Sequence, residues 1–296
     1  ILYCMLCSNR VSHFHFTIVS HYLILIVIVM FCLFCYRESY AGHYVPGFGY
    51  KIHEQNGKEG SLKIPLAGVA IGDGWIDPIT QLSAYPNMLY NIGVIDHLEK
   101  QVIHKYTSTS QKYIQEGDYY NAFTVWDEMM NGDIYPYPNY YHNITGSNDY
   151  DNFMNTNSPS ELGNYRSFVT SAETRKGIHV GGAVYGSNGN LCEMALIEDF
   201  MVSLKDEVEV LMNNYKVLIY SGQLDVIIGA ALTENMLPTF NWKGKEDFLA
   251  SKKAIWRIDP ADAEVAGYVK QHDLVTQIVV RGAGHLVPFD QPERWI

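Results

Sequence analysis

Ser39 stands where a serine hydroxyl could act as a nucleophile. It lies in the run Glu-Ser-Tyr-Ala-Gly at positions 38–42, directly after the apolar segment Phe31–Tyr36. A buried strand that turns sharply into a helix exposes such a hydroxyl at the end of a sheet. The pattern alone is weak, because a solvated turn has a similar composition. Arg37 departs from it, since a small residue usually stands two positions before the serine, where strand and helix cross closely.

A carboxylate and an imidazole follow in an order that suits acyl transfer. The segment Lys216–Tyr220 is typical of a short buried strand, and the turn after it delivers Asp225. A second β-branched strand, Gln277–Val280, precedes a glycine-rich loop that delivers His285. Singly, Asp225 could cap a turn and His285 could be one of eleven histidines without a chemical role. Together, each after a strand, they follow the order of the α/β-hydrolase triad.

Four ordered motifs resemble those of the serine carboxypeptidases, most closely the vitellogenic-like branch. They are segments 38–46 and 68–78, the loop that ends in Asp225, and segment 284–292. The resemblance covers roughly residues 38–296. It implies an α/β-hydrolase fold with a mostly parallel sheet and a hydrolase that removes one C-terminal residue from a peptide.

The resemblance also implies a role for each residue of the site. Ser39 is the acylating nucleophile, His285 the general base and then acid, and Asp225 the carboxylate that orients the imidazole. The backbone N–H of Tyr40 is one donor of the oxyanion hole. Glu38 resembles the glutamate that binds the substrate's terminal carboxylate, which needs a protonated side chain and predicts an acidic working range. The alternative for Glu38 is a carboxylate that interacts with a helix N-terminus.

The second oxyanion donor comes in this family from a glycine-rich loop far upstream of the serine. None of the 38 residues before Ser39 resembles that loop. Losing one donor lowers turnover on the order of a hundredfold to a thousandfold. We therefore expect low or no activity from this chain. The alternatives are an inactive relative that binds peptides or proteins, and a membrane-anchored variant.

The apolar N-terminal stretch has two interpretations. Positions 11–36 carry no formal charge, and residues 14–36 are long and apolar enough to approach a bilayer span. Their β-branched residues suit a strand equally well. A span that ended at position 36 would place Ser39 at a bilayer surface instead of at the end of a central strand. We therefore expect residues 1–30 to be an apolar segment foreign to the family, and membrane anchoring to be the less favoured interpretation.

The remaining chain divides into a core and an insertion. Residues 31–78 and 206–296 predict an α/β-hydrolase core with an incomplete sheet, whose apolar first strand becomes an unpaired edge. Residues 79–205 contain helical segments where the serine carboxypeptidases insert a helical cap, so the resemblance implies a cap there. The alternative is a helical bundle with no role in the active site. The expected helices cover 84–95, 96–116, 119–130 and 191–211 in the cap, and 245–258 in the core.

The composition limits the classes of molecule that the chain is expected to bind. The chain has 296 residues, 47% of them hydrophobic, and a net charge of −11, which argues against nucleic-acid binding. The resemblance implies peptide or protein C-termini as substrates, with no cofactor and no metal; membrane contact and oligomeric state are left open. The sequon at Asn143, in a tyrosine-rich loop, agrees with glycosylation in the secretory pathway and a lysosomal or extracellular location.

Three further residues are lesser candidates. His43 follows Ser39 by one helical turn and suits packing under the cap better than chemistry. Asp73 and Asp77 follow the expected strand at 66–71 and either line the substrate pocket or close a turn. Cys192 is the only cysteine after Ser39, so the part of the chain that resembles the family forms no disulfide within itself.

Overall fold

The computed structural model describes residues 33–132, 134, 138–186 and 191–295. The segment 1–30, expected to be foreign to the family, lies outside these ranges, as does most of the membrane alternative at 14–36. The part of that alternative that is described, from residue 33, is a strand. Across the described ranges, no helix combines the length and apolar character needed to cross a membrane.

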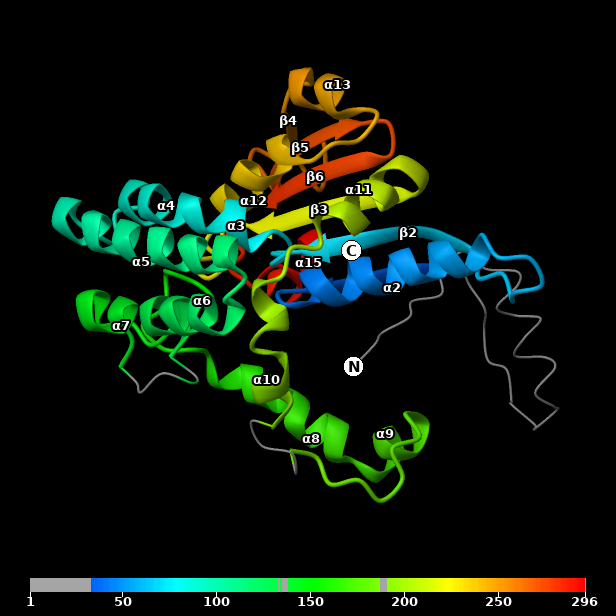
Figure 1. Ribbon diagram of the computed structural model, residues 1–296, viewed down its shortest axis with the longest axis horizontal. Helices are drawn as coiled ribbons and strands as arrows, with labels where there is room; N and C mark the ends of the chain where they lie inside the picture. Colours follow the sequence, from blue (N-terminus) through cyan, green and yellow to red (C-terminus); the bar gives the residue numbers. More distant parts are fainter. Residues whose placement is uncertain (1–32, 133, 135–137, 187–190, 296) are drawn as a thin grey trace.

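A six-stranded sheet forms the centre of the molecule (Figure 1). Four neighbouring strands run parallel and two antiparallel strands complete the far side. The parallel strands are the apolar runs predicted from the sequence, which is typical of strands covered on both faces. In spatial order the strands are β1 (Leu33–Glu38), β2 (Leu66–Gly72), β3 (Lys216–Gly222), β6 (Val275–Val280), β5 (Gly267–His272) and β4 (Ala254–Trp256).

Strand β1 is an edge strand among the strands described, as expected. It pairs with β2 alone, in a register that sets Glu38 beside Gly72. Strand β2 in turn pairs Gly72 with Tyr220 of β3. The carboxyl ends of three parallel strands therefore meet at one rim of the sheet, which is where sites form in α/β folds.

The two antiparallel strands were not predicted. The helix expected over 245–258 ends at Ala250, and residues 254–256 pair with β5 instead. Strands β5 and β6 form a hairpin that turns at Asp273, which has a positive φ of 49°. Strand β4 is a three-residue edge strand, and β5 mixes polar with apolar residues, so neither has the apolar run of a strand that is buried on both faces.

One face of the sheet packs against helices that flank the parallel strands. Helices α2 (Ala41–Asn56) and α11 (Lys205–Asn214) contact each other, and α2 lies on β2 (Figure 1). Their buried side chains share one hydrophobic cluster with strand residues such as Val69 and Ile219. The same cluster includes residues of α12 (Ala230–Met236), the 3₁₀ turn Leu237–Thr239 and α13 (Lys245–Ala250). This packing holds β1 and α2 rigidly around residue 39.

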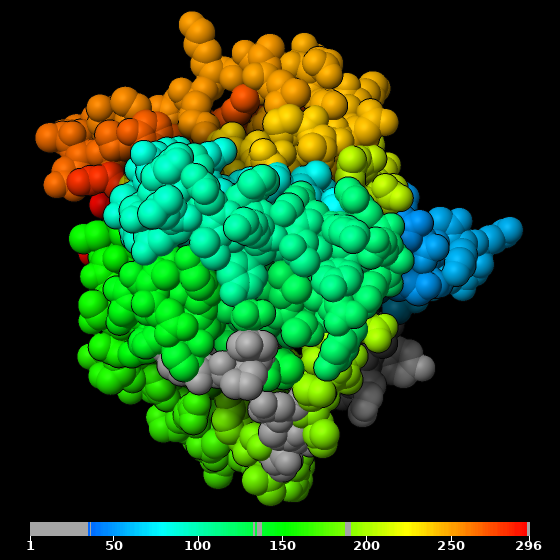
Figure 2. All heavy atoms as spheres, turned by 60° about the vertical axis from the view of Figure 1, so that its left-hand side comes forward, coloured from blue at the N-terminus to red at the C-terminus, as the bar shows by residue number. Residues whose placement is uncertain are grey.

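The residues between β2 and β3 form helices and loops, as expected for the insertion. They lie at one end of the sheet, and α8 and α9 extend away from it (Figure 1). In the space-filling view, atoms of this insertion make up the middle of the face that is turned forward (Figure 2). The helices are α3 (Pro78–Gln81), α4 (Tyr85–Asn91), α5 (His97–Glu116), α6 (Tyr119–Trp126), α7 (Tyr140–Thr145), α8 (Tyr165–Thr170), α9 (Ala172–Gly177) and α10 (Leu191–Leu196), with 3₁₀ turns at Leu82–Ala84, Ser160–Asn164 and Asp199–Met201. Two short helices, α14 (Val287–Asp290) and α15 (Pro292–Trp295), close the described chain.

The helices predicted in the cap match the observed helices to different degrees. Helix α5 follows the prediction, because Asp96 and Glu99 form a capping box at its start and Gly117 ends it in the left-handed conformation. The helix predicted over 119–130 ends at Trp126 and continues as a π-helical turn over 127–131. The helix predicted over 191–211 is broken into α10, a 3₁₀ turn and α11. Extended backbone at Val202 interrupts it.

Candidate active site

Ser39 occupies the sharp turn between β1 and α2. Its φ is 67°, a left-handed conformation that is strained for a residue with a side chain. The turn is held by backbone hydrogen bonds: Ser39 N donates to Gly72 O at 2.9 Å, and Ser39 O accepts from Gly42 N at 2.8 Å and Trp75 N at 3.2 Å. A Cβ atom at Gly42 would lie 2.4 Å from Trp75 O, so only glycine allows this approach. The backbone has the strand–turn–helix form predicted for a nucleophilic serine.

Arg37 does not obstruct this turn. Its side chain is exposed, whereas the small residue usual at this position would lie where a strand and a helix cross. The departure at Arg37 is therefore compatible with the geometry at Ser39.

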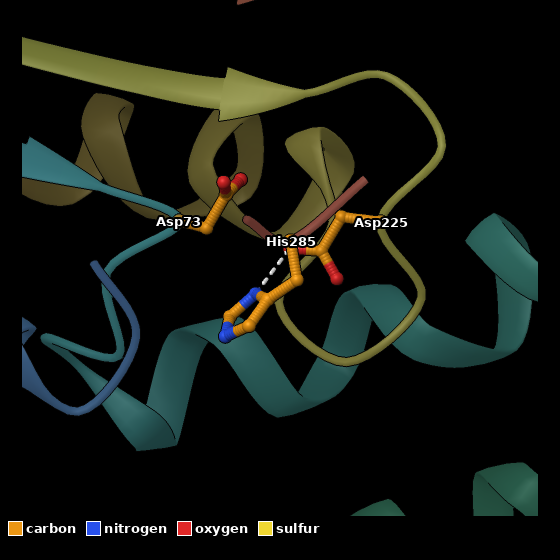
Figure 3. A group of neighbouring side chains, drawn as sticks. All are labelled: Asp73, Asp225 and His285. Carbon is orange, nitrogen blue, oxygen red and sulfur yellow. Dashed lines mark hydrogen bonds and ion pairs between the residues drawn. The ribbon is translucent and has the colours of Figure 1, made fainter. Parts of the chain in front are cut away.

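Asp225 and His285 form a buried pair on the loops that follow β3 and β6 (Figure 3). His285 Nδ1 lies 2.8 Å from Asp225 Oδ2. Each partner is also held by the backbone: Asp225 Oδ1 accepts from Ile228 N at 3.1 Å, and His285 N donates to the carbonyl of Asp151 at 2.7 Å. The Asp225 carboxylate fixes the imidazole so that its Nε2 atom is free for proton transfer.

A cavity of about 510 Å³ is lined by both Ser39 and His285. Ser39, Tyr40 and His285 all contribute to its wall. The opposite wall is apolar and aromatic and comes from the inserted helices, with Phe123, Trp126, Leu196, Ile197 and Phe200 among its residues. Within the described part of the chain, no hydrogen bond joins the Ser39 hydroxyl to His285. Catalytic hydrogen bonds often tighten only when substrate binds.

The predicted oxyanion donor, Tyr40, and the predicted carboxylate-binding residue, Glu38, are the two chain neighbours of Ser39. Tyr40 directly precedes α2, so its N–H belongs to the first-turn donors that have no partner inside the helix. Glu38 ends β1, and its Oε1 atom accepts a hydrogen bond from the Tyr220 hydroxyl at 3.2 Å. All five predicted site residues therefore lie at one rim of the sheet.

Burial and neighbouring charges raise the pKa values of two site residues, Glu38 and His285. Desolvation raises the pKa of Glu38 to about 7, although His285, Tyr220 and Arg37 oppose the shift. Desolvation lowers the pKa of His285, but the Asp225 carboxylate outweighs it, and Asp151 and Glu38 add to the effect, so the pKa is raised to about 9. Near neutral pH, Glu38 is thus partly protonated and His285 is mainly charged.

Two further carboxyl groups lie near the imidazole: Asp151, which had no role in the sequence analysis, and Asp73, a lesser candidate that is not part of the cavity wall. Asp151 lines the cavity, and burial raises its pKa to about 6. It lies in an asparagine- and tyrosine-rich stretch without a motif, so the sequence carried no signal for it. Asp73 is wholly buried, and its carboxyl lies with Asp225 and His285 in a group whose nearest polar atoms are all within 4.8 Å of one another (Figure 3). Such residue types also bind metal ions, but Asp225 Oδ2 and His285 Nδ1 are already bonded to each other.

Asp77 and His43, two of the three lesser candidates, contact other side chains of the fold. The Asp77 carboxylate accepts hydrogen bonds from Thr80 Oγ1 at 2.6 Å and Ser203 Oγ at 2.7 Å, which closes the turn before α3. His43 is buried, and its Nδ1 atom lies 3.5 Å from the Asp199 carboxylate. Desolvation lowers the pKa of His43 to about 4.

The sequon residue Asn143 is exposed, but it lies in helix α7 and not in a loop. The loop prediction was wrong because Asn139 caps this short helix by accepting a hydrogen bond from His142 N at 2.8 Å. The two described cysteines, Cys35 and Cys192, form no disulfide.

The strand order, the serine at the strand–helix turn and the Asp–His pair define an α/β-hydrolase. The chain belongs to the serine carboxypeptidase family, whose family model matches residues 32–296. It is 40% identical over 257 residues to a probable serine carboxypeptidase of Homo sapiens, covering 87% of this chain and 54% of the relative. It is 37% identical to a venom serine carboxypeptidase of Apis mellifera (86% and 54% covered) and 34% identical to a vitellogenic carboxypeptidase of Aedes aegypti (86% and 53% covered).

A solved structure has the same fold. It is that of a prohormone-processing carboxypeptidase from Saccharomyces cerevisiae, with a TM-score of 0.61 and 20% identity over 87% of this chain and 59% of that one. The chain spans about half the length of the curated relatives it matches.

Proposed function

We propose that this chain carries the catalytic residues of a serine-type carboxypeptidase, a hydrolase that removes the C-terminal residue of a peptide or protein. Ser39 is the nucleophile, His285 the general base and acid, and Asp225 the orienting carboxylate. The observation that carries the proposal is the shared cavity, whose wall contains a strained serine and an imidazole held by a buried carboxylate. Family membership supports the same assignment.

The reaction follows from these positions. Ser39 Oγ bonds to the scissile carbonyl carbon while its proton passes to His285 Nε2. His285 gives that proton to the leaving amine as the C–N bond breaks, which leaves an acyl-enzyme. A water molecule then attacks the ester, its proton passing to His285 and from there to Ser39 Oγ. The Tyr40 N–H stabilises the oxyanion during both acylation and deacylation.

Glu38 confers the preference for a free C-terminus. A protonated Glu38 can donate a hydrogen bond to the terminal carboxylate of a peptide, whereas an ionised Glu38 repels it. The raised pKa of about 7 keeps this side chain protonated across the acidic range. Endopeptidase action is disfavoured, because an internal peptide bond offers no carboxylate at this point.

The two raised pKa values also support low activity in this chain. His285 must be neutral to accept the Ser39 proton, which favours a pH above about 9, while Glu38 must be protonated, which favours a pH below about 7. The combination of both correct forms is therefore a minor one at every pH. This favours a second candidate function, a carboxypeptidase-like protein that binds peptide C-termini with little turnover.

We further assign residues 31–78 and 206–296 to the catalytic core and 79–205 to a cap over it. The cap supplies most of the apolar cavity wall. The location we propose is the secretory pathway, lysosomal or extracellular, with glycosylation at the exposed Asn143.

Peptide shortening tests the proposed function. The chain is incubated with a peptide that has a free C-terminus and with its C-terminally amidated form, and products are identified by mass spectrometry. We expect slow loss of one residue from the free peptide only. The activity should be absent in Ser39→Ala and retained in Ser108→Ala, a control at an exposed serine of α5. Equal shortening of both peptides, or shortening by Ser39→Ala, would contradict the proposal.

A further inference from the structure

Asp73 lies at the end of β2, in a position that is energetically unfavourable for a carboxyl group. Its φ is 41°, and it lies between Gly72 and Gly74 at the rim where the catalytic loops meet. A non-glycine residue in this conformation is uncommon and is concentrated at functional sites. The side chain is completely buried (0% exposed). The fold therefore holds a carboxyl group here against both backbone strain and desolvation.

The two oxygens of Asp73 have different surroundings. Oδ1 accepts a hydrogen bond from Gly222 N at 2.9 Å. Oδ2 is buried and accepts no hydrogen bond from any group in the described residues. A buried carboxylate oxygen without a donor is strongly unfavourable, whereas a protonated oxygen needs only an acceptor.

The candidate acceptor is the Asp225 carboxylate, because one side-chain oxygen of Asp73 and one of Asp225 lie within 4.8 Å of each other (Figure 3). Asp225 Oδ2 accepts from His285 and Oδ1 accepts from Ile228 N, and each oxygen has a second lone pair. Two carboxylates in contact cannot both be ionised in a buried site. Asp225 must be the ionised member, because it alone is bonded to the imidazole.

We propose that Asp73 is a positioning residue whose protonated Oδ2 donates a hydrogen bond to the ionised Asp225 carboxylate. The charged and titratable groups around it agree with this arrangement. Burial first, and then the negative charges of Asp225 and Glu38, raise the pKa of Asp73 well above its usual range. His285 is the positive neighbour in the cluster, and its bond goes to Asp225. The ionised Asp225 carboxylate thus accepts one hydrogen bond from Asp73 and one from His285.

The inference deepens the proposed function, on which its catalytic meaning rests. A hydrogen bond from Asp73 fixes the second face of the Asp225 carboxylate and thereby the orientation of the His285 ring. An ionised Asp73 would instead repel Asp225 and hold His285 more firmly in its charged form. The role is indirect, because Asp73 is absent from the wall of the substrate cavity.

A carboxyl titration tests the protonation state without requiring activity. The full chain is labelled with ¹³C at the aspartate side-chain carboxyls, and the resonances are followed by NMR from pH 4 to pH 8. We expect one buried carboxyl that stays protonated up to at least neutral pH and that disappears in Asp73→Asn. Asp151→Asn is the matched control, because Asp151 is a partly buried aspartate near the imidazole whose pKa is also raised. A resonance assigned to Asp73 that titrates near pH 4 would overturn the inference.

A comparison of two variants tests the positioning role. Asparagine is isosteric, tolerates a positive φ and keeps a donor toward Asp225, whereas alanine removes the donor. The rate at which a fluorophosphonate labels Ser39 should be roughly tenfold higher in Asp73→Asn than in Asp73→Ala, the size of one hydrogen bond to a charged group. Equal labelling rates in the two folded variants would contradict the role. Failure to label Ser39 in the wild-type chain counts against the proposed function, while the NMR titration still decides the protonation of Asp73.

Discussion

The hydroxyl of Tyr220 on β3 donates a hydrogen bond to Glu38 Oε1 at the end of β1, across the intervening strand β2. The Tyr220 ring passes over Gly72, where a Cβ atom would lie 2.1 Å from the ring. The predicted carboxylate-binding residue is therefore tied to the strand that leads to Asp225. This bond opposes the raised pKa of Glu38, because it stabilises the ionised form, yet burial dominates.

The raised pKa of Glu38 predicts how stability depends on pH. Because the folded state binds the Glu38 proton more tightly than the unfolded state, stability falls as pH rises from about 4.5 to about 7. Glu38→Gln removes this loss, so it should stabilise the chain by up to roughly 3 kcal/mol at pH 8 and by little at pH 4. Urea unfolding at both pH values measures the difference. The control Glu59→Gln, at an exposed site, keeps Glu38, so its free energy of unfolding should differ between the two pH values as much as that of the wild-type chain does.

The raised pKa of His285 predicts that Ser39 becomes more reactive as pH rises. Below about pH 9 the imidazole is mainly protonated and cannot accept the Ser39 proton. The rate of fluorophosphonate labelling should therefore rise about tenfold per pH unit between pH 6 and pH 8. A rate that is flat over this range would show that His285 is already neutral.

Asp151→Asn should make Ser39 more reactive near neutral pH. The Asp151 carboxylate raises the pKa of His285, whereas its backbone carbonyl, which holds His285 N, is unchanged by the substitution. Removing the charge lowers the pKa of His285 and enlarges its neutral fraction. The labelling–pH curve should shift to lower pH by a few tenths of a unit or more. An unchanged curve would mean that Asp151 does not act on the imidazole.

Gly222→Ala should disrupt the contact between the two loops that carry the Asp–His pair. A Cβ atom at Gly222 would lie 2.0 Å from Gly284 O, so one loop must move. We expect a destabilisation of about 2 kcal/mol or more and a loss of labelling at Ser39. Gly47→Ala in α2 is the matched control, because its Cβ would meet no atom within 4 Å. It should stabilise the helix by roughly 0.5–1 kcal/mol.

Site residues could be predicted from the sequence where the residues next to them in the chain form a recognisable motif. Ser39, Asp225 and His285 each follow an apolar strand, and local pattern and order were sufficient to place them at one rim. Asp151 comes from the middle of the insertion, and only the fold brings its backbone carbonyl to His285 N. The antiparallel strands β4 and β5 were missed because β4 is only three residues long and β5 mixes polar with apolar residues, so neither has the long apolar run of the buried parallel strands.

Asp73 could be predicted from the sequence only in part. Its position after a strand and between two glycines was visible in the sequence and suggested a turn or a pocket residue. Its complete burial beside Asp225 was not, because it depends on the adjacent pairing of β2 and β3, which are separated by more than a hundred residues. Long-range strand pairing leaves no local signal in composition or periodicity.

Identification of the residue modified by a fluorophosphonate tests the central assignment most directly. The full chain is treated at pH 8, digested and mapped by mass spectrometry, alongside Ser39→Ala and His285→Gln. The account predicts a single adduct on Ser39, absent from Ser39→Ala and strongly reduced in His285→Gln. An adduct on another serine, or equal labelling of Ser39 with and without the imidazole, would contradict the assignment of Ser39 as a nucleophile activated by His285.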